Sequence, residues 1–231
     1  MEITRKIDTE KKRMIPKLLV ATCGNLILFL LLAFTIHTYN GLWIDQPVVN
    51  FVQVHITGTG YNLIAFFTNL GDKVVVISVG VLSLFILWWK TRDYMGMITI
   101  AVVLAGSNEL FQSLKDVFLR ERPILDPSID ATGYSFPSGH STVSMAFYGI
   151  LLYFILKYMK SSLIKTGVIL FFSFYILFMG VSRILLRAHY VSDVLAGFAI
   201  GFVYLMICIF VYEKVVERKE LNRKNKSELT V

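Results

Sequence analysis

SFPSGHSTVSMAFYGILLYFIL, residues 135–156, places a proline, a glycine and a histidine immediately before a long apolar run. A helix that starts here leaves its first backbone N–H groups without partners inside the helix. Ser138 can cap such a start, which is a purely structural interpretation. The alternative is that the free N–H groups bind an anion, and that His140 acts on this anion. The rest of the chain decides between these interpretations.

The composition is that of a membrane protein. The chain has 231 residues, of which 55% are hydrophobic and only 17% are charged, whereas soluble domains carry about 25% charged residues. The length suits a single helical domain over residues 1–231. The net charge of +7 gathers at the two ends, so a nucleic-acid-binding face is not expected. Cys23 and Cys208 lie in apolar runs, which favours small packing residues over a disulfide.

Six segments are apolar over about 20 residues, the length that spans a bilayer. The first is too long for a cleaved signal peptide and has no cleavage-like site, so it is expected to be retained. Residues 42–70 instead mix aromatic, polar and glycine residues, which is typical of one or two short helices in the membrane interface. The sequence therefore predicts an all-α integral membrane protein with transmembrane helices at 16–38, 72–90, 94–114, 140–158, 163–183 and 191–213.

Lysine and arginine residues predict how these helices are oriented. They are frequent in the tails 1–15 and 214–231 and absent from residues 38–72. Because positive loops stay inside, we expect a multi-pass protein of the plasma membrane with both tails in the cytoplasm and the second tail frayed. The loops 38–72, 115–139 and 184–190 then face outward.

Two of these outward segments carry positive charge against the usual bias. One holds Lys115, Arg120 and Arg122, and the other holds Arg183 and Arg187. Surface charge tolerated on short loops is one interpretation, and an outward-facing anion site is the other. We favour the anion site, because both segments lie near span ends on the same side as SFPSGH.

A phosphate group suits this set of residues. It carries about two charges and three strong acceptor oxygens, which arginine binds with a fork of donors and lysine with a point charge. The N–H groups near Ser138, Gly139 and His140 add donors, and Gly139 has no Cβ to hinder close approach.

His189 and Asp193 are four residues apart, the spacing of one helix face. Asp193 would accept a hydrogen bond from one ring nitrogen, which leaves the other nitrogen free to attack phosphorus. His140 would then protonate the departing oxygen.

The three segments together resemble the signature of the type 2 phosphatidic acid phosphatase (PAP2) family. The matching residues are Lys115-x6-Arg122-Pro123, then Pro137-Ser138-Gly139-His140, then Ser182-Arg183-x5-His189-x3-Asp193. The family also includes soluble bacterial acid phosphatases and vanadium haloperoxidases. Within it, the chain looks most like the bacterial phosphatidylglycerophosphatase B-type membrane enzymes.

This resemblance implies a role for each residue of the signature. His189 would be the nucleophile, Asp193 its orienting carboxylate and His140 the general acid. No metal or cofactor would be needed. The phosphate ligands would be Lys115, Arg122, Ser138, Gly139 and Arg183, whereas Arg120 and Arg187 lie outside the signature.

The expected activity is hydrolysis of a lipid phosphate at the outer membrane face through a phosphohistidine. Candidate substrates are phosphatidylglycerophosphate, undecaprenyl diphosphate and phosphatidic acid. One alternative is a protein that binds or flips lipid phosphates without hydrolysis, in which the paired histidines have no task. Another is oxidation with bound vanadate, which the membrane spans disfavour because those relatives are soluble.

Several polar residues within the spans have no place in the signature. Asn108, Gln112 and Lys115 share one helix face and predict a polar stripe that leads from the site. Glu109 is expected to face protein with a cationic or protonated partner, because an exposed carboxylate at lipid depth is costly. His37 and His55 are interpreted as interface residues.

Overall fold

A computed structural model describes residues 2–123 and 133–228, and within these ranges all regular elements are helical. Part of the predicted outward loop 115–139, residues 124–132, lies outside the described residues. The elements are α1 (Glu2–Tyr39), α2 (Asp45–His55), α3 (Gly58–Thr68), the 3-10 turn η1 (Asn69–Gly71), α4 (Lys73–Lys90), α5 (Tyr94–Phe118), α6 (Gly139–Val143), the π-helical turn η2 (Ser144–Tyr148), α7 (Gly149–Tyr158), α8 (Ser162–Leu185) and α9 (Val191–Glu228).

The predicted membrane spans are confirmed. The described residues contain six helices long and apolar enough to cross a bilayer, at 16–39, 73–90, 94–118, 139–158, 162–185 and 191–223. The prediction of a frayed tail after residue 213 is wrong, because α9 continues to Glu228. Its Lys, Arg and Glu residues are good helix formers, and they extend a helix that is already nucleated.

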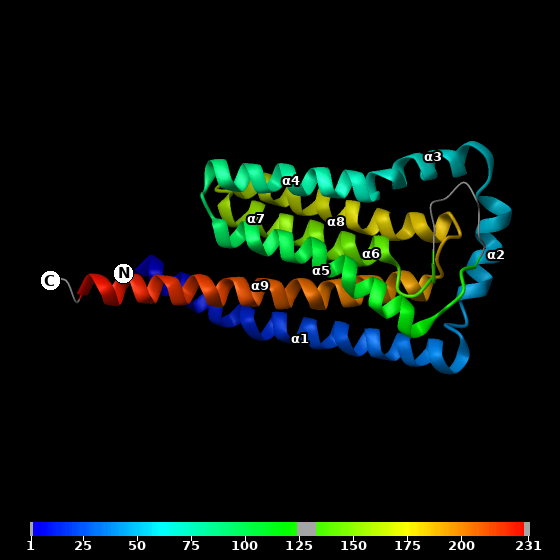
Figure 1. Cartoon of the computed structure of the whole chain (residues 1–231), viewed down its shortest axis with the longest axis horizontal. Coiled ribbons are helices and arrows are strands. Elements are labelled where there is room, and N and C mark those ends of the chain that lie inside the picture. Colours follow the sequence, from blue (N-terminus) through cyan, green and yellow to red (C-terminus); the bar gives the residue numbers. More distant parts are fainter. Residues whose placement is uncertain (1, 124–132, 229–231) are drawn as a thin grey trace.

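The long helices lie side by side, and the two short helices α2 and α3 lie together at one end of the bundle (Figure 1). The prediction of one or two short helices within 42–70 is thus confirmed. The start of α1 and the end of α9 lie at the opposite end (Figure 1). Both termini are therefore on one side of the bundle, although which side faces the cytoplasm stays a prediction.

Small residues bring α9 very close to α6. A Cβ on Gly197 would lie 2.7 Å from the carbonyl oxygen of Ser138, and one on Gly201 would lie 2.6 Å from that of Thr142. These two glycines therefore permit close packing of α9 on α6. The close approach also sets the start of α9 against SFPSGH, where the Ser138 N–H donates to the Asp193 carbonyl at 3.0 Å.

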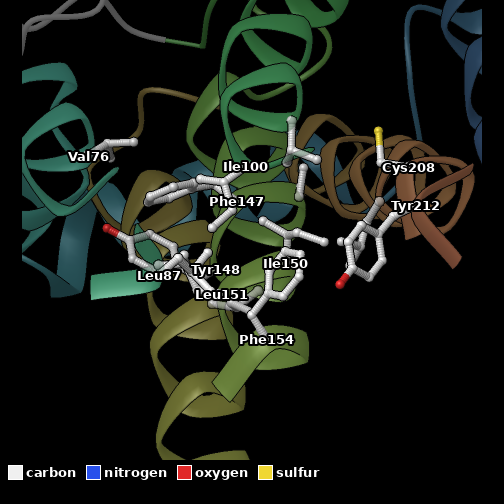
Figure 2. Close-up of a cluster of buried hydrophobic side chains, with 14 residues drawn as sticks. Val76, Leu87, Ile100, Phe147, Tyr148, Ile150, Leu151, Phe154, Cys208 and Tyr212 are labelled. Carbon is white, nitrogen blue, oxygen red and sulfur yellow. The ribbon is translucent and has the colours of Figure 1, made fainter. Parts of the chain in front are cut away.

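The fourth span forms the interior of the bundle. Phe147, Ile150 and Phe154 lie at the centre of a buried apolar cluster that also includes Cys208 (Figure 2). Both cysteines are free, as predicted, but Cys23 is exposed on α1 and is not a packing residue within this chain. Packing of the surrounding helices against this span holds its polar start, at residues 139–140, in a fixed position.

Candidate active site

A groove with a volume of about 730 Å³ runs between α4 and α5 and reaches the loops at the α2–α3 end of the bundle. One wall is apolar and includes Ile77, Leu84 and Leu104. Most of the residues that the sequence predicted for a phosphate site meet at its polar end. They are Lys115, Arg122, Gly139, His140, Arg183 and His189.

The His189 ring is buried and its proton can be placed from its neighbours. Arg122 Nη1 lies 3.1 Å from His189 Nε2 and also donates to the Ala188 carbonyl at 2.8 Å. A guanidinium has only donors, so Nε2 is the acceptor and the neutral ring carries its proton on Nδ1. Burial, which is the largest cause, and the charges of Arg122 and Arg183 together lower the pKa of His189 to about 3, although Asp193 opposes this shift. The ring is therefore neutral at physiological pH, and Nε2 has a lone pair for attack on an electrophile.

The predicted direct hydrogen bond between His189 and Asp193 is not present. Nδ1 lies 3.7 Å from Asp193 Oδ2, which is too long for a hydrogen bond. Ser135 lies between them: its Oγ is 3.2 Å from His189 Nδ1 and donates to Asp193 Oδ2 at 2.5 Å. The difference arises because α9 begins at Val191, so His189 precedes the helix and the one-face rule does not apply to it.

Asp193 is held from its other side by Arg120, a residue outside the signature. Arg120 Nη1 donates to Asp193 Oδ1 at 2.5 Å, and the side chains are 2% and 0% exposed, so this is a fully buried ion pair. The sequence motifs predict no role beside Asp193 for either Arg120 or Ser135. The signal for Arg120 was its positive charge on an outward loop, and the signal for Ser135 was its place in SFPSGHS.

Three cations surround the polar end of the groove. Lys115 and Arg183 are 7% and 3% exposed, so little water screens their charge. Arg122 is held in place by the Gly133 carbonyl, to which its Nε donates at 2.9 Å. Buried cations around a cavity attract an anion of high charge, which agrees with the anion-site interpretation.

His140 lies on the first turn of α6 and its ring faces the groove. Its Nε2 is 3.9 Å from Asp72 Oδ1, and a Cβ on Gly71 would lie 3.0 Å from the ring. The turn η1 therefore packs directly on this histidine. His140 and His189 line the same groove.

Ser138 is engaged within the protein, so its predicted contact with phosphate finds no support in this arrangement. Its hydroxyl accepts hydrogen bonds from Ser141, which caps α6, and its N–H donates to Asp193. The structural interpretation of Ser138 as a helix cap is confirmed. Gly139 does line the groove, and its lack of a Cβ makes room for the ring of Phe111, which would lie 2.8 Å from that atom.

The predicted polar stripe is confirmed, because Asn108, Gln112 and Lys115 all line the groove. The prediction for Glu109 is wrong: it is exposed on the groove wall and accepts a hydrogen bond from Asn108 at 3.4 Å, instead of facing another helix. The groove lining does not include His37 or His55.

A buried neutral imidazole and three cations at the mouth of an apolar groove, within a bundle of membrane helices, define a phosphatase that works at a membrane. The chain belongs to the PAP2 superfamily, whose family model matches residues 93–217. It is thus a membrane lipid phosphatase and a phosphoric monoester hydrolase of that superfamily.

Three matches illustrate the similarity. Phosphatidylglycerophosphatase B of Bacillus subtilis (strain 168) is 30% identical over 208 residues, which cover 82% of this chain and 93% of the relative. The crystal structure of a transmembrane PAP2-type phosphatidylglycerolphosphate phosphatase from Bacillus subtilis matches with a TM-score of 0.77 at 25% identity, over 84% of this chain and 96% of the other. Aquifex aeolicus LpxE shares the fold, with a TM-score of 0.56 at 20% identity, over 73% of this chain and 96% of the other.

Proposed function

We propose that the protein hydrolyses the phosphate head of a lipid at the outer face of the plasma membrane, through a phosphohistidine on His189. The observation that carries this proposal is the continuous groove. Its polar end holds the two histidines and three cations, and its apolar wall lies between the membrane helices α4 and α5. A lipid can therefore place its head at His189 while its chains remain among apolar side chains.

In the first step, His189 Nε2 attacks phosphorus and the bond from phosphorus to the lipid oxygen breaks. The hydrogen bond from Arg122 to Nε2 is exchanged for one to a phosphate oxygen, which frees the lone pair. Lys115, Arg122 and Arg183 balance the charge on the non-bridging oxygens. The negative charge of the bound phosphate favours the protonated form of His140, which gives its proton to the departing lipid oxygen.

In the second step, a water molecule attacks the phosphorus of the phosphohistidine. His140, now neutral, takes a proton from this water, and the P–N bond breaks to release inorganic phosphate. The Nδ1 proton stays on the ring throughout. The positive charge of the phosphorylated ring is stabilised through Ser135 by the Asp193 carboxylate.

Phosphatidylglycerophosphate is the first substrate that we propose. Beyond its terminal phosphate it carries a glycerol group before the acyl chains, and the polar stripe of Asn108 and Gln112 lies next to Lys115 along the groove. The name of the Bacillus subtilis relative supports the same choice. Undecaprenyl diphosphate is the second candidate and phosphatidic acid the third.

The outer location rests on charge. The tails 1–15 and 214–231 carry 11 of the 23 Lys and Arg residues. The start of α1 and the end of α9 lie at one end of the bundle, and the short helices α2 and α3 lie at the other (Figure 1). The polar end of the groove includes Gly71 and Lys73, which follow α3. By the positive-inside rule, the end with the tails is cytoplasmic. The lipid would then enter sideways from the outer leaflet.

The test is phosphate release in detergent with EDTA present, on each of the three lipids. We expect metal-independent release by the wild type, complete loss in His189→Ala, and unchanged release in His55→Ala, whose exposed histidine is bound to the Phe51 carbonyl outside the groove. Release that survives His189→Ala would remove His189 as nucleophile. If the wild type bound these lipids without releasing phosphate, the binding or flipping alternative would replace hydrolysis.

A further inference from the structure

Asp45, the first residue of α2, is linked to the His189 ring through buried side chains of two other segments. Its carboxylate is 5% exposed, and its Oδ2 accepts a hydrogen bond from Arg120 Nη2 at 2.9 Å. The other nitrogen of that guanidinium, Nη1, holds Asp193, which in turn accepts from Ser135 beside His189. A continuous set of polar contacts therefore joins α2 to the nucleophile.

Ser192 ties Asp45 to the start of α9 independently of the ion pair. Its N–H donates to Asp45 Oδ1 at 3.0 Å, and its hydroxyl donates to Asp45 Oδ2 at 2.5 Å while accepting from Arg120 Nη1 at 2.7 Å. The Asp45 carboxylate thus fixes both the Arg120 guanidinium and the residue next to Asp193. Neither Asp45 nor Arg120 lines the groove, so neither touches a bound lipid.

Arg120 uses its two terminal nitrogens on different carboxylates, with the Tyr190 ring stacked 4.2 Å from its centre. A guanidinium fork imposes a plane on the groups that it binds, and a second carboxylate on Nη2 keeps that plane from rotating. Asp45 also balances the Arg120 charge, so the negative charge of Asp193 is not fully neutralised by Arg120. That negative charge is what the ring needs when phosphorylation makes it cationic.

We propose that Asp45 is a positioning residue for catalysis, which acts through Arg120, Asp193 and Ser135 on His189. This inference rests on the proposed role of His189 as nucleophile. Asp45 precedes residues 93–217, which match the family model. The inference therefore gives a catalytic role to α2, a helix outside the matched residues. The outer helix α2 is then part of the active structure as well as a cover for the bundle end.

The experiment compares Asp45→Asn with the wild type, with kcat, KM and the rate of phosphohistidine formation in a single turnover as readouts. Glu121→Gln is the matched control, because it removes an exposed carboxylate one residue from Arg120 without touching the linked side chains. Ser192→Ala is a second variant, which removes one bridging hydroxyl with little change in volume. Thermal unfolding in detergent and the fraction of enzyme that can be phosphorylated report on folding.

We expect Asp45→Asn to lower kcat and the rate of ring phosphorylation by about tenfold or more, as for other residues that orient a catalytic ligand. KM should stay within about twofold, because the cations that bind phosphate are untouched. Ser192→Ala should show the same pattern to a smaller extent, and Glu121→Gln should behave as wild type.

Other outcomes would overturn the inference. In the first, Asp45→Asn has a lower fraction of enzyme that can be phosphorylated, but kcat per phosphorylatable site is unchanged. In the second, Asp45→Asn has a raised KM at constant kcat. If Asp45→Asn does not fold, Ser192→Ala decides by the same criteria. His189→Ala, measured in parallel, separates the two proposals. If His189→Ala is active, His189 is not the nucleophile. If His189→Ala is inactive and Asp45→Asn is fully active, only the role of Asp45 is refuted.

Discussion

Replacing Ser135 with alanine tests the arrangement that the structure shows around His189. The change removes a hydroxyl that lies 3.2 Å from His189 Nδ1 and donates to Asp193 at 2.5 Å. The backbone N–H of residue 135 still donates to the Arg120 carbonyl at 2.7 Å, so the local chain path should persist. What is lost is the hydroxyl that links the His189 ring to the Asp193 carboxylate.

The size of the effect follows from the charge on the ring. When Nε2 bonds to phosphorus the imidazole becomes cationic, and its Nδ1–H then donates to a hydroxyl polarised by a carboxylate. A hydrogen bond to a charged group contributes about 1.5–3 kcal/mol. Because each 1.36 kcal/mol is about a factor of ten in rate, kcat should fall roughly 10- to 150-fold, with KM nearly unchanged.

The assay is steady-state phosphate release in detergent with the preferred lipid, and Ser107→Ala is the control. Ser107 is equally buried, and its hydroxyl donates only to the Leu104 carbonyl within α5. A kcat of Ser135→Ala equal to or above that of the wild type would refute the reasoning. It would mean that Asp193 closes the 3.7 Å gap and orients the ring directly.

Three further predictions concern the ring, the groove and the packing. Because the pKa of His189 is lowered to about 3, the NMR signal of its ring should remain that of a neutral imidazole from pH 8 down to about pH 4.5. The signal is assigned by its loss in His189→Ala. A titration midpoint of the ring above about pH 5.5 would contradict this prediction. Gly80→Leu should narrow the groove, since even a Cβ there would lie 3.1 Å from Leu104. We expect kcat/KM to fall about tenfold for the lipid but not for a water-soluble phosphate monoester. Equal losses on both substrates would count against the groove as the lipid site. Gly197→Ala should destabilise the protein by about 1–3 kcal/mol, because the new Cβ would meet the Ser138 carbonyl at 2.7 Å; an unchanged Tm would contradict the close packing of α9 on α6.

Much of the site follows from motif spacing combined with span counting. Lys115, Arg122, His140, Arg183 and His189 each lie near a span end, and alternation of the spans puts these ends on one side. Side chains anchored to neighbouring helix ends on one side must meet if the helices pack as a bundle. Their common place on the groove therefore needed no knowledge of the tertiary contacts.

The link to Asp193 needed more than spacing. The rule that residues four apart share a face holds only inside a helix, and His189 precedes α9. Arg120 contacts Asp45, 75 residues away, and Asp45 contacts Ser192, 147 residues away. In a sequence, one carboxylate in an interfacial helix resembles any surface charge, and only the docking of α2 makes it part of a buried pair.

The hydrogen bond from Arg122 to His189 also affects which ions the site can hold. Neutral imidazole is the commonest protein ligand for metal ions, and an accessible lone pair would ordinarily bind Zn²⁺ or Cu²⁺. Here the lone pair is occupied by a cationic donor, and Lys115 and Arg183 line the same groove. A divalent cation that approaches meets repulsion at each of these side chains. The charges that we propose bind phosphate therefore also repel trace metal ions from the His189 ring.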